Sequence, residues 1–233
     1  MSRSMKLTRR YYVGDTETTG LPGKGGKVCE IAWLEIDEDF NVLDTVRSLI
    51  NPEHPIPADM SAIHGITDKH VDSAPTIDEF MDGFMFVNAE GESVLVAHNA
   101  PFDIQFFQPY MPNLIGTVCT LKMARAFLKD APNNKLQTLK FHLDLEADVA
   151  HHEAHTALAD CKVTLELLRY LHLSTGMTLT EMMVFCSKPE VITHWPFGKH
   201  RGRPLDCDMG YVKWALKNMD NMSADLRVAL EKL

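Results

Sequence analysis

The sequence predicts an α/β fold: a mixed five-stranded sheet flanked by helices, followed by a small C-terminal α+β appendage. Two β-rich runs, residues 28–36 and 42–50, enclose a short polar turn and predict an antiparallel hairpin. Beyond them, short apolar strands alternate with helical segments, which is typical of β-α units with helices on both faces of a sheet. A glycine-rich, basic stretch at residues 194–205 marks the appendage.

The elements follow in chain order. Residues 11–15 are expected to form the first strand, before the hairpin. The capping box Thr76-Ile77-Asp78-Glu79 predicts a helix to about Val87, because its side chains can bond the free amides of a first helical turn. The later elements are expected as a strand at 93–97, a helix at 102–110, a strand at 118–119, and helices at 121–128 and 157–172.

These elements are expected to form one domain over residues 1–175, with residues 176–233 as a separate appendage. Within the appendage, Thr178-Leu179-Thr180-Glu181 is a second capping box. Two short helices are expected after the basic stretch, at 211–217 and 224–232.

Composition restricts the class of protein. The chain is 45% hydrophobic and 24% charged, as in an ordinary globular protein. No stretch approaches the roughly 18 apolar residues of a membrane span, so we expect no membrane contact. The net charge of −9 is unlike that of a protein that coats nucleic acid nonspecifically. The five cysteines lie far apart without a Cys-x-x-Cys pair, which favours reduced thiols and a cytoplasmic location.

Asp15 and Glu17 are two residues apart at the end of the first expected strand. Side chains two apart in a strand share one face, so these carboxylates would repel each other unless a cation lay between them. Mg²⁺ and Mn²⁺ prefer such oxygen ligands. Taken alone, the pair is better explained as an exposed acidic pair leading into the turn Thr18-Thr19-Gly20.

Two further aspartates lie where a sheet-edge site would need them. Asp103 follows the apolar strand at 93–97, at the edge where open sheets place ligands, although a helix-capping aspartate is the alternative. Asp160 lies among apolar positions of the 157–172 helix, where a carboxylate is costly unless it is paired or bound to a metal.

His155 lies five residues before Asp160, about 140° away around a helix that turns ~100° per residue. We therefore expect it on the loop before the helix, leaning over the site. A histidine there could take a proton from water, since its ordinary pKa is near neutral. A surface histidine in a loop that also carries His151 and His152 is the alternative.

Two other segments resemble known motifs but lack residues or spacings that those motifs require. Gly23-Lys24-Gly25-Gly26-Lys27 is unlike a phosphate-binding P-loop, because Leu21 stands where the first glycine is required and Val28 replaces the Ser/Thr. His152-Glu153-Ala154-His155 spaces its histidines three apart, where the zinc-protease motif requires four.

Together and in order, these motifs resemble the DnaQ-like 3′→5′ exonucleases of the ribonuclease H-like superfamily, in the DEDDh branch whose third motif carries histidine. The matching segments are Asp15–Leu21, Glu30–Ala32, Ile63–Thr67, His98–Asp103 and His155–Asp160. The resemblance implies two Mg²⁺ (or Mn²⁺) ions per active site, with His155 deprotonating the attacking water. The metal ligands that it implies are Asp15, Glu17, Asp103 and Asp160. It also implies that Thr18, His64 and Asn99 help to seat the terminal nucleotide.

The segments Phe197–Leu205 and Gly210–Trp214 resemble the C-terminal region of the bacterial exodeoxyribonuclease X family. Lys199, Arg201 and Arg203 place three fixed positive charges within a short stretch of an acidic protein. Neighbouring glycines let phosphates approach the backbone amides. We therefore expect these three side chains to bind substrate, with a solvated surface loop as the alternative.

The expected function is a metal-dependent 3′→5′ exodeoxyribonuclease that acts on DNA 3′ ends. It would release nucleoside 5′-monophosphates by a two-metal mechanism, in DNA repair. An RNA 3′→5′ exonuclease and a polymerase proofreading subunit of the same fold stay open as alternatives, because DNA over RNA rests on the C-terminal resemblance. A noncatalytic nucleic-acid-binding module is a further alternative, which the intact set of five catalytic residues argues against.

Overall fold

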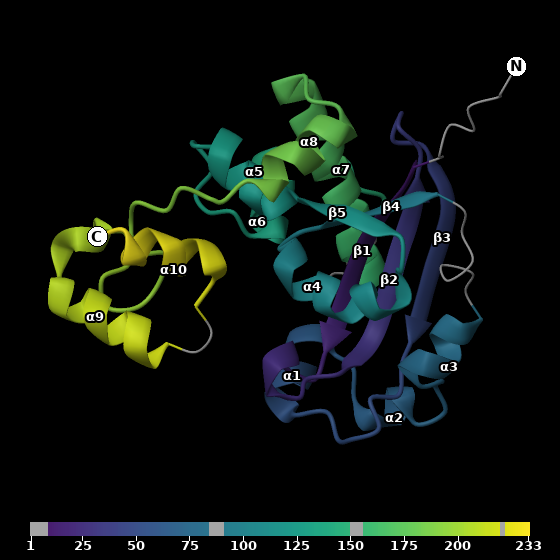
Figure 1. Cartoon of the computed structure of the whole chain (residues 1–233). Helices are drawn as coiled ribbons and strands as arrows, with labels where there is room; N and C mark the ends of the chain where they lie inside the picture. Colours follow the sequence, from purple (N-terminus) through teal and green to yellow (C-terminus); the bar gives the residue numbers. More distant parts are fainter. Residues whose placement is uncertain (1–8, 84–90, 150–155, 220–221) are drawn as a thin grey trace, which may run out of the picture. The chain divides into compact units, whose positions relative to one another are not determined.

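The computed structural model describes residues 9–83, 91–149, 156–219 and 222–233. The chain forms two compact units, Met1–Ser187 and Lys188–Leu233. Figure 1 shows a twisted sheet covered by helices in the first unit, and the helices labelled α9 and α10 in the second. Within the described residues, no helix combines the length and apolar character needed to cross a membrane.

The sheet of the first unit has the strand order β3-β2-β1-β4-β5. Its middle strand β1 pairs antiparallel with β2 and parallel with β4. β3 extends the hairpin on one side, and β5 adds a second parallel strand on the other. The strands span Arg9–Thr18 (β1), Val28–Ile36 (β2), Val42–Leu49 (β3), Glu92–Ala97 (β4) and Leu114–Cys119 (β5). The predicted mixed five-stranded sheet is therefore confirmed.

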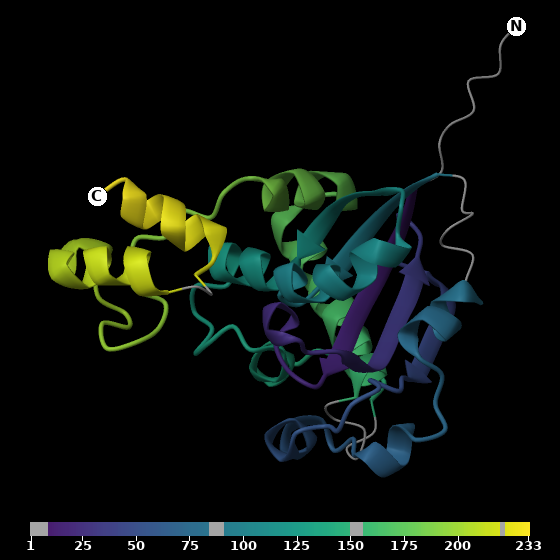
Figure 2. The same ribbon diagram turned by 60° about the horizontal axis from the view of Figure 1, so that its bottom comes forward.

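Successive side chains of β1 point to opposite faces of the sheet and enter two buried clusters, one on each face. Tyr11 and Val13 belong to a buried cluster that includes residues of the long helix α7 (Ala157–Thr175). Tyr12 points the other way, into a cluster that contains Phe107 of helix α4 (Ala100–Phe107). In Figure 2, α7 (green) and α4 (teal) accordingly lie on opposite sides of β1 (purple).

The remaining helices of the first unit are short. They are α1 (Ala58–His64), α2 (Asp68–Val71), α3 (Ile77–Asp82), α5 (Thr120–Phe127), α6 (Leu136–His142) and α8 (Leu179–Ser187). The sequence did not predict α1, α2 or α6, because helices of seven residues or fewer barely repeat the helical spacing of apolar side chains. The predicted helix to Val87 is observed as far as Asp82, and the segment 84–87 lies outside the described residues.

The division between the two units follows α8 rather than residue 175. Helix α8 packs on strand β5: the Sγ atom of Cys186 accepts a hydrogen bond from the amide of Cys119 at 3.3 Å. Leu179 and Met182 of α8 are buried in the same core as α7. The predicted boundary was too early because a capping box marks the start of a helix and does not report where its apolar face packs.

The second unit has its own small core beneath helices α9 (Met209–Asn218) and α10 (Ala224–Glu231). The two helices match the predicted ones to within two residues at each end. An isolated antiparallel bridge between His194 and Pro204 is the β component of this unit in its described residues. The buried side chains of this core are Trp195, Leu205, Val212, Ala215, Leu226 and Leu230.

Candidate active site

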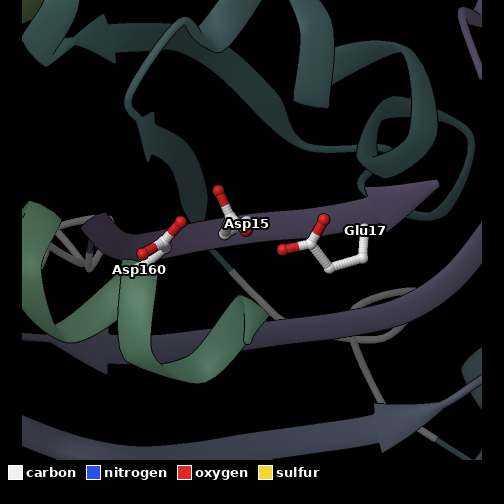
Figure 3. Close-up of side chains that lie close together, drawn as sticks. All are labelled: Asp15, Glu17 and Asp160. Carbon is white, nitrogen blue, oxygen red and sulfur yellow. The ribbon is translucent and has the colours of Figure 1, made fainter. Parts of the chain in front are cut away.

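Three carboxylates converge where β1 passes the first turn of α7. Asp15 and Glu17 project from the same face of β1, as the period of a strand requires, and Asp160 meets them from α7 (Figure 3). One ligand oxygen from each of the three residues lies within 4.8 Å of the others. All three side chains are partly buried. The structure thus joins two of the sequence motifs into one acidic cluster.

The start of α7 is built to bring Asp160 close to the sheet. Thr156 caps the helix, its Oγ1 atom accepting a hydrogen bond from the amide of Ala159 at 3.3 Å. Ala157 and Ala159 are buried, and their small side chains let the helix approach the strands. Gln137 of α6 donates from Nε2 to Oδ1 of Asp160 at 2.6 Å, which fixes the orientation of that carboxylate.

Glu30 of β2 is a buried carboxylate beside this cluster, and it has two partners. Its Oε2 atom accepts a hydrogen bond from the amide of Ala157 at 2.9 Å, and its Oε1 atom pairs with Nε of Arg47 at 2.5 Å. The side chain is 1% exposed. Glu30 therefore ties the first residue of α7 to the sheet, three residues before Asp160.

Asp103 approaches β1 from α4, on the opposite side from α7. Its Oδ1 atom accepts hydrogen bonds from the amide of Thr16 at 3.1 Å and from the hydroxyl of Thr16 at 2.8 Å. Thr16 lies between Asp15 and Glu17 and points to the other face of the strand, which explains this contact. Asp103 is buried and stands beside the three clustered carboxylates rather than among them.

Burial and mutual repulsion raise the pKa values of these acids. The pKa of Asp15 lies well above its ordinary value because the group is buried and because Asp103, Asp160 and Glu17 are nearby. Burial and the charge of Asp160 raise the pKa of Glu17 to about 8. Burial raises the pKa of Asp103 to about 7, although the hydrogen bonds from Thr16 act in the opposite direction. A cation at this site would relieve the repulsion.

The donor set of this site fits a hard divalent cation. Every clustered ligand atom is a carboxylate oxygen, the type that Mg²⁺ and Mn²⁺ prefer. Grouped, partly buried carboxylates are unfavourable without a compensating positive charge. The three carboxylates could therefore hold a divalent cation.

Comparison with known proteins identifies this arrangement. A family model described as an exonuclease, RNase_T, matches residues 13–168. The chain belongs to the DnaQ-like 3′→5′ exonuclease family. It is 32% identical over 224 residues to Exodeoxyribonuclease 10 of Escherichia coli (strain K12), covering 93% of this chain and 95% of that protein. The predicted family and enzyme class are thus confirmed.

Two further likenesses agree with this assignment. The exonuclease is 34% identical over 166 residues to the PolC-type DNA polymerase III of Clostridium perfringens (strain 13 / Type A), covering 69% of this chain and 11% of that protein. Its fold matches the solved structure of exonuclease X in complex with 5′ overhanging duplex DNA, with a TM-score of 0.60 and 29% sequence identity. That match covers 76% of this chain and 98% of the other, which confirms the predicted ribonuclease H-like fold.

Three other residues were predicted to take part in catalysis or nucleotide binding: His155, Thr18 and Asn99. His155, the predicted general base, lies outside the described residues. Thr18 is buried, and its hydroxyl donates to the carbonyl of Gly20 at 3.0 Å. Asn99 is exposed and occupies the left-handed N-cap position of α4, with φ 82°. Nucleotide contacts by Thr18 and Asn99 stay predictions.

His64, the last residue of α1, is buried and engaged at both ring nitrogens. Its Nδ1 atom accepts a hydrogen bond from the amide of Ile66 at 3.1 Å, and its Nε2 atom lies 3.7 Å from Sγ of Cys29. Burial lowers its pKa below the ordinary value. The ring therefore holds the loop after α1 against β2, and its predicted contact with a nucleotide would involve the edge or face that these bonds leave free.

Lys199, Arg201 and Arg203 belong to the second unit, and all three are exposed. The Nζ atom of Lys199 lies 3.5 Å from the carboxylate of Asp208, and Nη1 of Arg203 lies 3.5 Å from Nδ1 of His200. Within the described part of the chain, Arg201 has no acidic partner. The three basic side chains thus lie at the surface of the second unit, and their role in substrate binding stays a prediction.

The sequence alone did not assign roles to Glu30, Gln137 and Thr16. Glu30 stands in a segment that matches the family, but an acid in an apolar strand carries no local sign of its partner. Gln137 lies in α6, which the sequence did not predict, and Thr16 lies in the first matching segment, where its sequence neighbours do not indicate its partner Asp103. In each case the signal is a contact with a residue distant in the sequence.

Proposed function

We propose that this exonuclease acts on DNA, hydrolysing phosphodiesters from 3′ ends to nucleoside 5′-monophosphates in DNA repair. The observation that carries the proposal is the extent of the likeness to Exodeoxyribonuclease 10, which spans both units of this chain and nearly all of the relative. Two PolC-type polymerases also resemble this chain, over 69% and 90% of its length, but the matches cover only 11% and 14% of those polymerases. A chain that matches nearly all of an exodeoxyribonuclease is better explained as an independent enzyme than as a proofreading subunit.

We further propose that Asp15, Glu17 and Asp160, with Asp103 beside them, hold two Mg²⁺ or Mn²⁺ ions. Two such ions stabilise the attacking and leaving oxygens of a phosphoryl displacement when they are bound. His155 would accept the proton of the attacking water. The water oxygen would bond to the terminal phosphorus as the bond to the 3′ oxygen of the preceding nucleotide breaks.

Substrate binding would draw on both units. Thr18, His64 and Asn99 would seat the terminal nucleotide, and Lys199, Arg201 and Arg203 would neutralise phosphates elsewhere on the strand. The described cysteines are all free, which supports a reducing compartment such as the cytoplasm as the place of action.

Matched DNA and RNA oligonucleotides test this proposal. The wild-type protein is incubated with each strand and Mg²⁺, with or without EDTA, and released mononucleotides are identified by chromatography. We expect 5′-deoxynucleotides from DNA, little release from RNA, and no release in EDTA or with Asp160→Asn. Equal or faster cleavage of RNA would contradict DNA as the preferred substrate and would favour an RNA exonuclease. Cleavage of neither strand would support the noncatalytic alternative.

A further inference from the structure

Helix α9 presents a pair of stacked aromatic rings at the surface of the second unit. Tyr211 and Trp214 are three residues apart, so they share one side of the helix. Their ring centroids lie 5.3 Å apart with an interplanar angle of 16°. Trp214 is 50% exposed, whereas Trp33 and Trp195 are 2% and 1% exposed. Since the chain has three tryptophans, Trp214 is the one in contact with solvent.

The surrounding residues fix Tyr211 in position. Trp195 and His200 meet its ring edge-on, at centroid distances of 4.7 and 4.8 Å. The Tyr211 amide donates to Oδ1 of Asp208 at 2.9 Å. Gly198 adopts φ +77°, and a Cβ atom there would lie 2.8 Å from the Tyr211 hydroxyl, so glycine is required at this turn. The stack is therefore a rigid surface that Trp214 extends into solvent.

A basic side chain lies over this aromatic surface, and two more are on the same loop. Nζ of Lys199 lies 5.0 Å from the centroid of the Tyr211 ring. Asp208 offsets part of the Lys199 charge, while Arg201 and Arg203 on the same loop add two exposed guanidinium groups. Residues 188–233 carry eight Lys and Arg against six Asp and Glu, whereas residues 1–187 carry 15 against 26. A ligand suited to this surface combines negative charge with flat aromatic faces.

We propose that this platform, made of Tyr211, Trp214, Lys199, Arg201 and Arg203, binds single-stranded DNA by stacking an unpaired base on Trp214. The basic side chains would neutralise the adjacent phosphates. Aromatic side chains stack on bases of any sequence, but a base offers its face only when it is outside a duplex. The inference rests on the proposed function, because the ligand is the strand that the enzyme degrades. It adds a base-stacking site in the second unit and a preference for unpaired DNA.

Intrinsic fluorescence gives a direct test, because the other two tryptophans are buried. The full-length protein is titrated in EDTA with oligo(dT), with an abasic strand of equal length, and with a duplex. We expect oligo(dT) to quench the emission and to bind more tightly than the abasic strand, although both carry the same phosphates. Duplex DNA should quench less.

Variants complete the test. Stacking on one base contributes enough affinity that Trp214→Leu should weaken oligo(dT) binding by roughly tenfold. Trp214→Phe should retain most of the affinity, and Val191→Ala, at an 87% exposed apolar residue of the same unit, should leave it unchanged. A melting curve checks that each variant is folded. If Trp214→Leu does not fold, the comparison of oligo(dT) with the abasic strand on the wild-type protein decides.

Equal binding and equal quenching by oligo(dT) and the abasic strand would overturn the inference, because phosphate contacts would then account for all of the binding. Wild-type affinity in folded Trp214→Leu would also overturn it, and would favour a protein partner at this surface. Neither result touches the proposed function, which fails separately if the wild-type enzyme releases no 5′-deoxynucleotides from DNA.

Discussion

Glu17 illustrates how strongly single residues of this site depend on a counter-charge. Burial and Asp160 raise its pKa to about 8, whereas an unfolded glutamate titrates near pH ~4.3. Between these values the folded chain holds a proton that the unfolded chain has released. Raising the pH therefore favours the unfolded state, and the stability of the metal-free protein falls over this interval.

This pH dependence can be measured as the melting temperature in EDTA. We expect it to decrease as the pH rises from about 5 to about 8, and Glu17→Gln should flatten the decrease because it removes the titrating group. Saturating Mg²⁺ should flatten it as well. A melting temperature that rises across this range in EDTA, in wild type and variant alike, would show that the acidic cluster is not under electrostatic strain.

Glu30 is expected to position Asp160 through helix α7 rather than to contact substrate. Glu30→Ala removes the acceptor of the Ala157 amide and leaves Arg47 without its partner. Residues that orient metal ligands typically contribute 10–100-fold to affinity or activity, so we expect a loss of that order and a higher Mg²⁺ requirement. Glu30→Gln can still accept from the amide and should recover part of the activity.

The control for Glu30 is Arg47→Gln, which removes the ion pair and keeps the bond to α7. Its Mg²⁺ requirement should stay near that of the wild type. If Glu30→Ala lowered the melting temperature without changing the Mg²⁺ dependence of turnover, its role would be structural only.

At the scale of elements, the distance between α4 and β1 depends on Gly14. A Cβ atom at this position would lie 2.8 Å from Cζ of Phe107 and 3.1 Å from Cδ1 of Leu95. Gly14→Ala should push α4 away from β1 and displace Asp103, which lies one turn before Phe107. Overpacking of this kind costs about 1–3 kcal/mol, measured by chemical denaturation. Turnover should fall as well, because Asp103 belongs to the site.

A second substitution separates these effects. In the double variant Gly14→Ala with Phe107→Leu, the smaller side chain makes room for the new methyl group, so activity should be higher than in Gly14→Ala alone. If activity were lost in Gly14→Ala and not restored in the double variant, the strand itself, rather than the position of α4, would be sensitive to the methyl group.

Patterns of period two and of helical spacing explain how far the sequence predicted these elements. They place Asp15 with Glu17 on one strand face and Asp160 on the apolar side of a long helix, and the structure brings these groups together. Such patterns do not report contacts between distant segments. The bond from Glu30 to Ala157, the orientation of Asp160 by Gln137 and the packing of α8 on β5 therefore required the structure.

At the scale of the whole molecule, the first unit is acidic and carries the carboxylate cluster, whereas the second unit has a slight excess of basic residues. We therefore expect catalysis to depend on the first unit and DNA affinity to depend partly on the second. Truncation after Ser187 should leave a folded nuclease with a raised Michaelis constant for DNA and similar turnover at saturation. Truncation after Gly176 should unfold more readily, because it deletes buried Leu179 and Met182. Melting curves and steady-state kinetics of both truncated chains check this. Equal stability of the two would contradict the boundary at residue 187.

Replacing Lys199, Arg201 and Arg203 together by alanine isolates the contribution of charge. Each phosphate contact adds about 0.9 to the log–log salt slope on duplex DNA and ~0.7 on single strands. The triple variant should therefore bind DNA more weakly and with a flatter salt dependence. Unchanged affinity and slope would identify the loop as ordinary solvated surface.

We propose that the carboxylates on β1, α4 and α7 form a two-metal centre. Its most direct test is the number of Mn²⁺ ions bound per chain, measured by electron paramagnetic resonance in the presence of a deoxynucleoside 5′-monophosphate. We predict two ions for the wild-type protein and fewer for Asp15→Asn, with the melting temperature of the metal-free variant maintained or raised. Absence of bound Mn²⁺ in the wild type, or an undiminished count in Asp15→Asn, would contradict the claim.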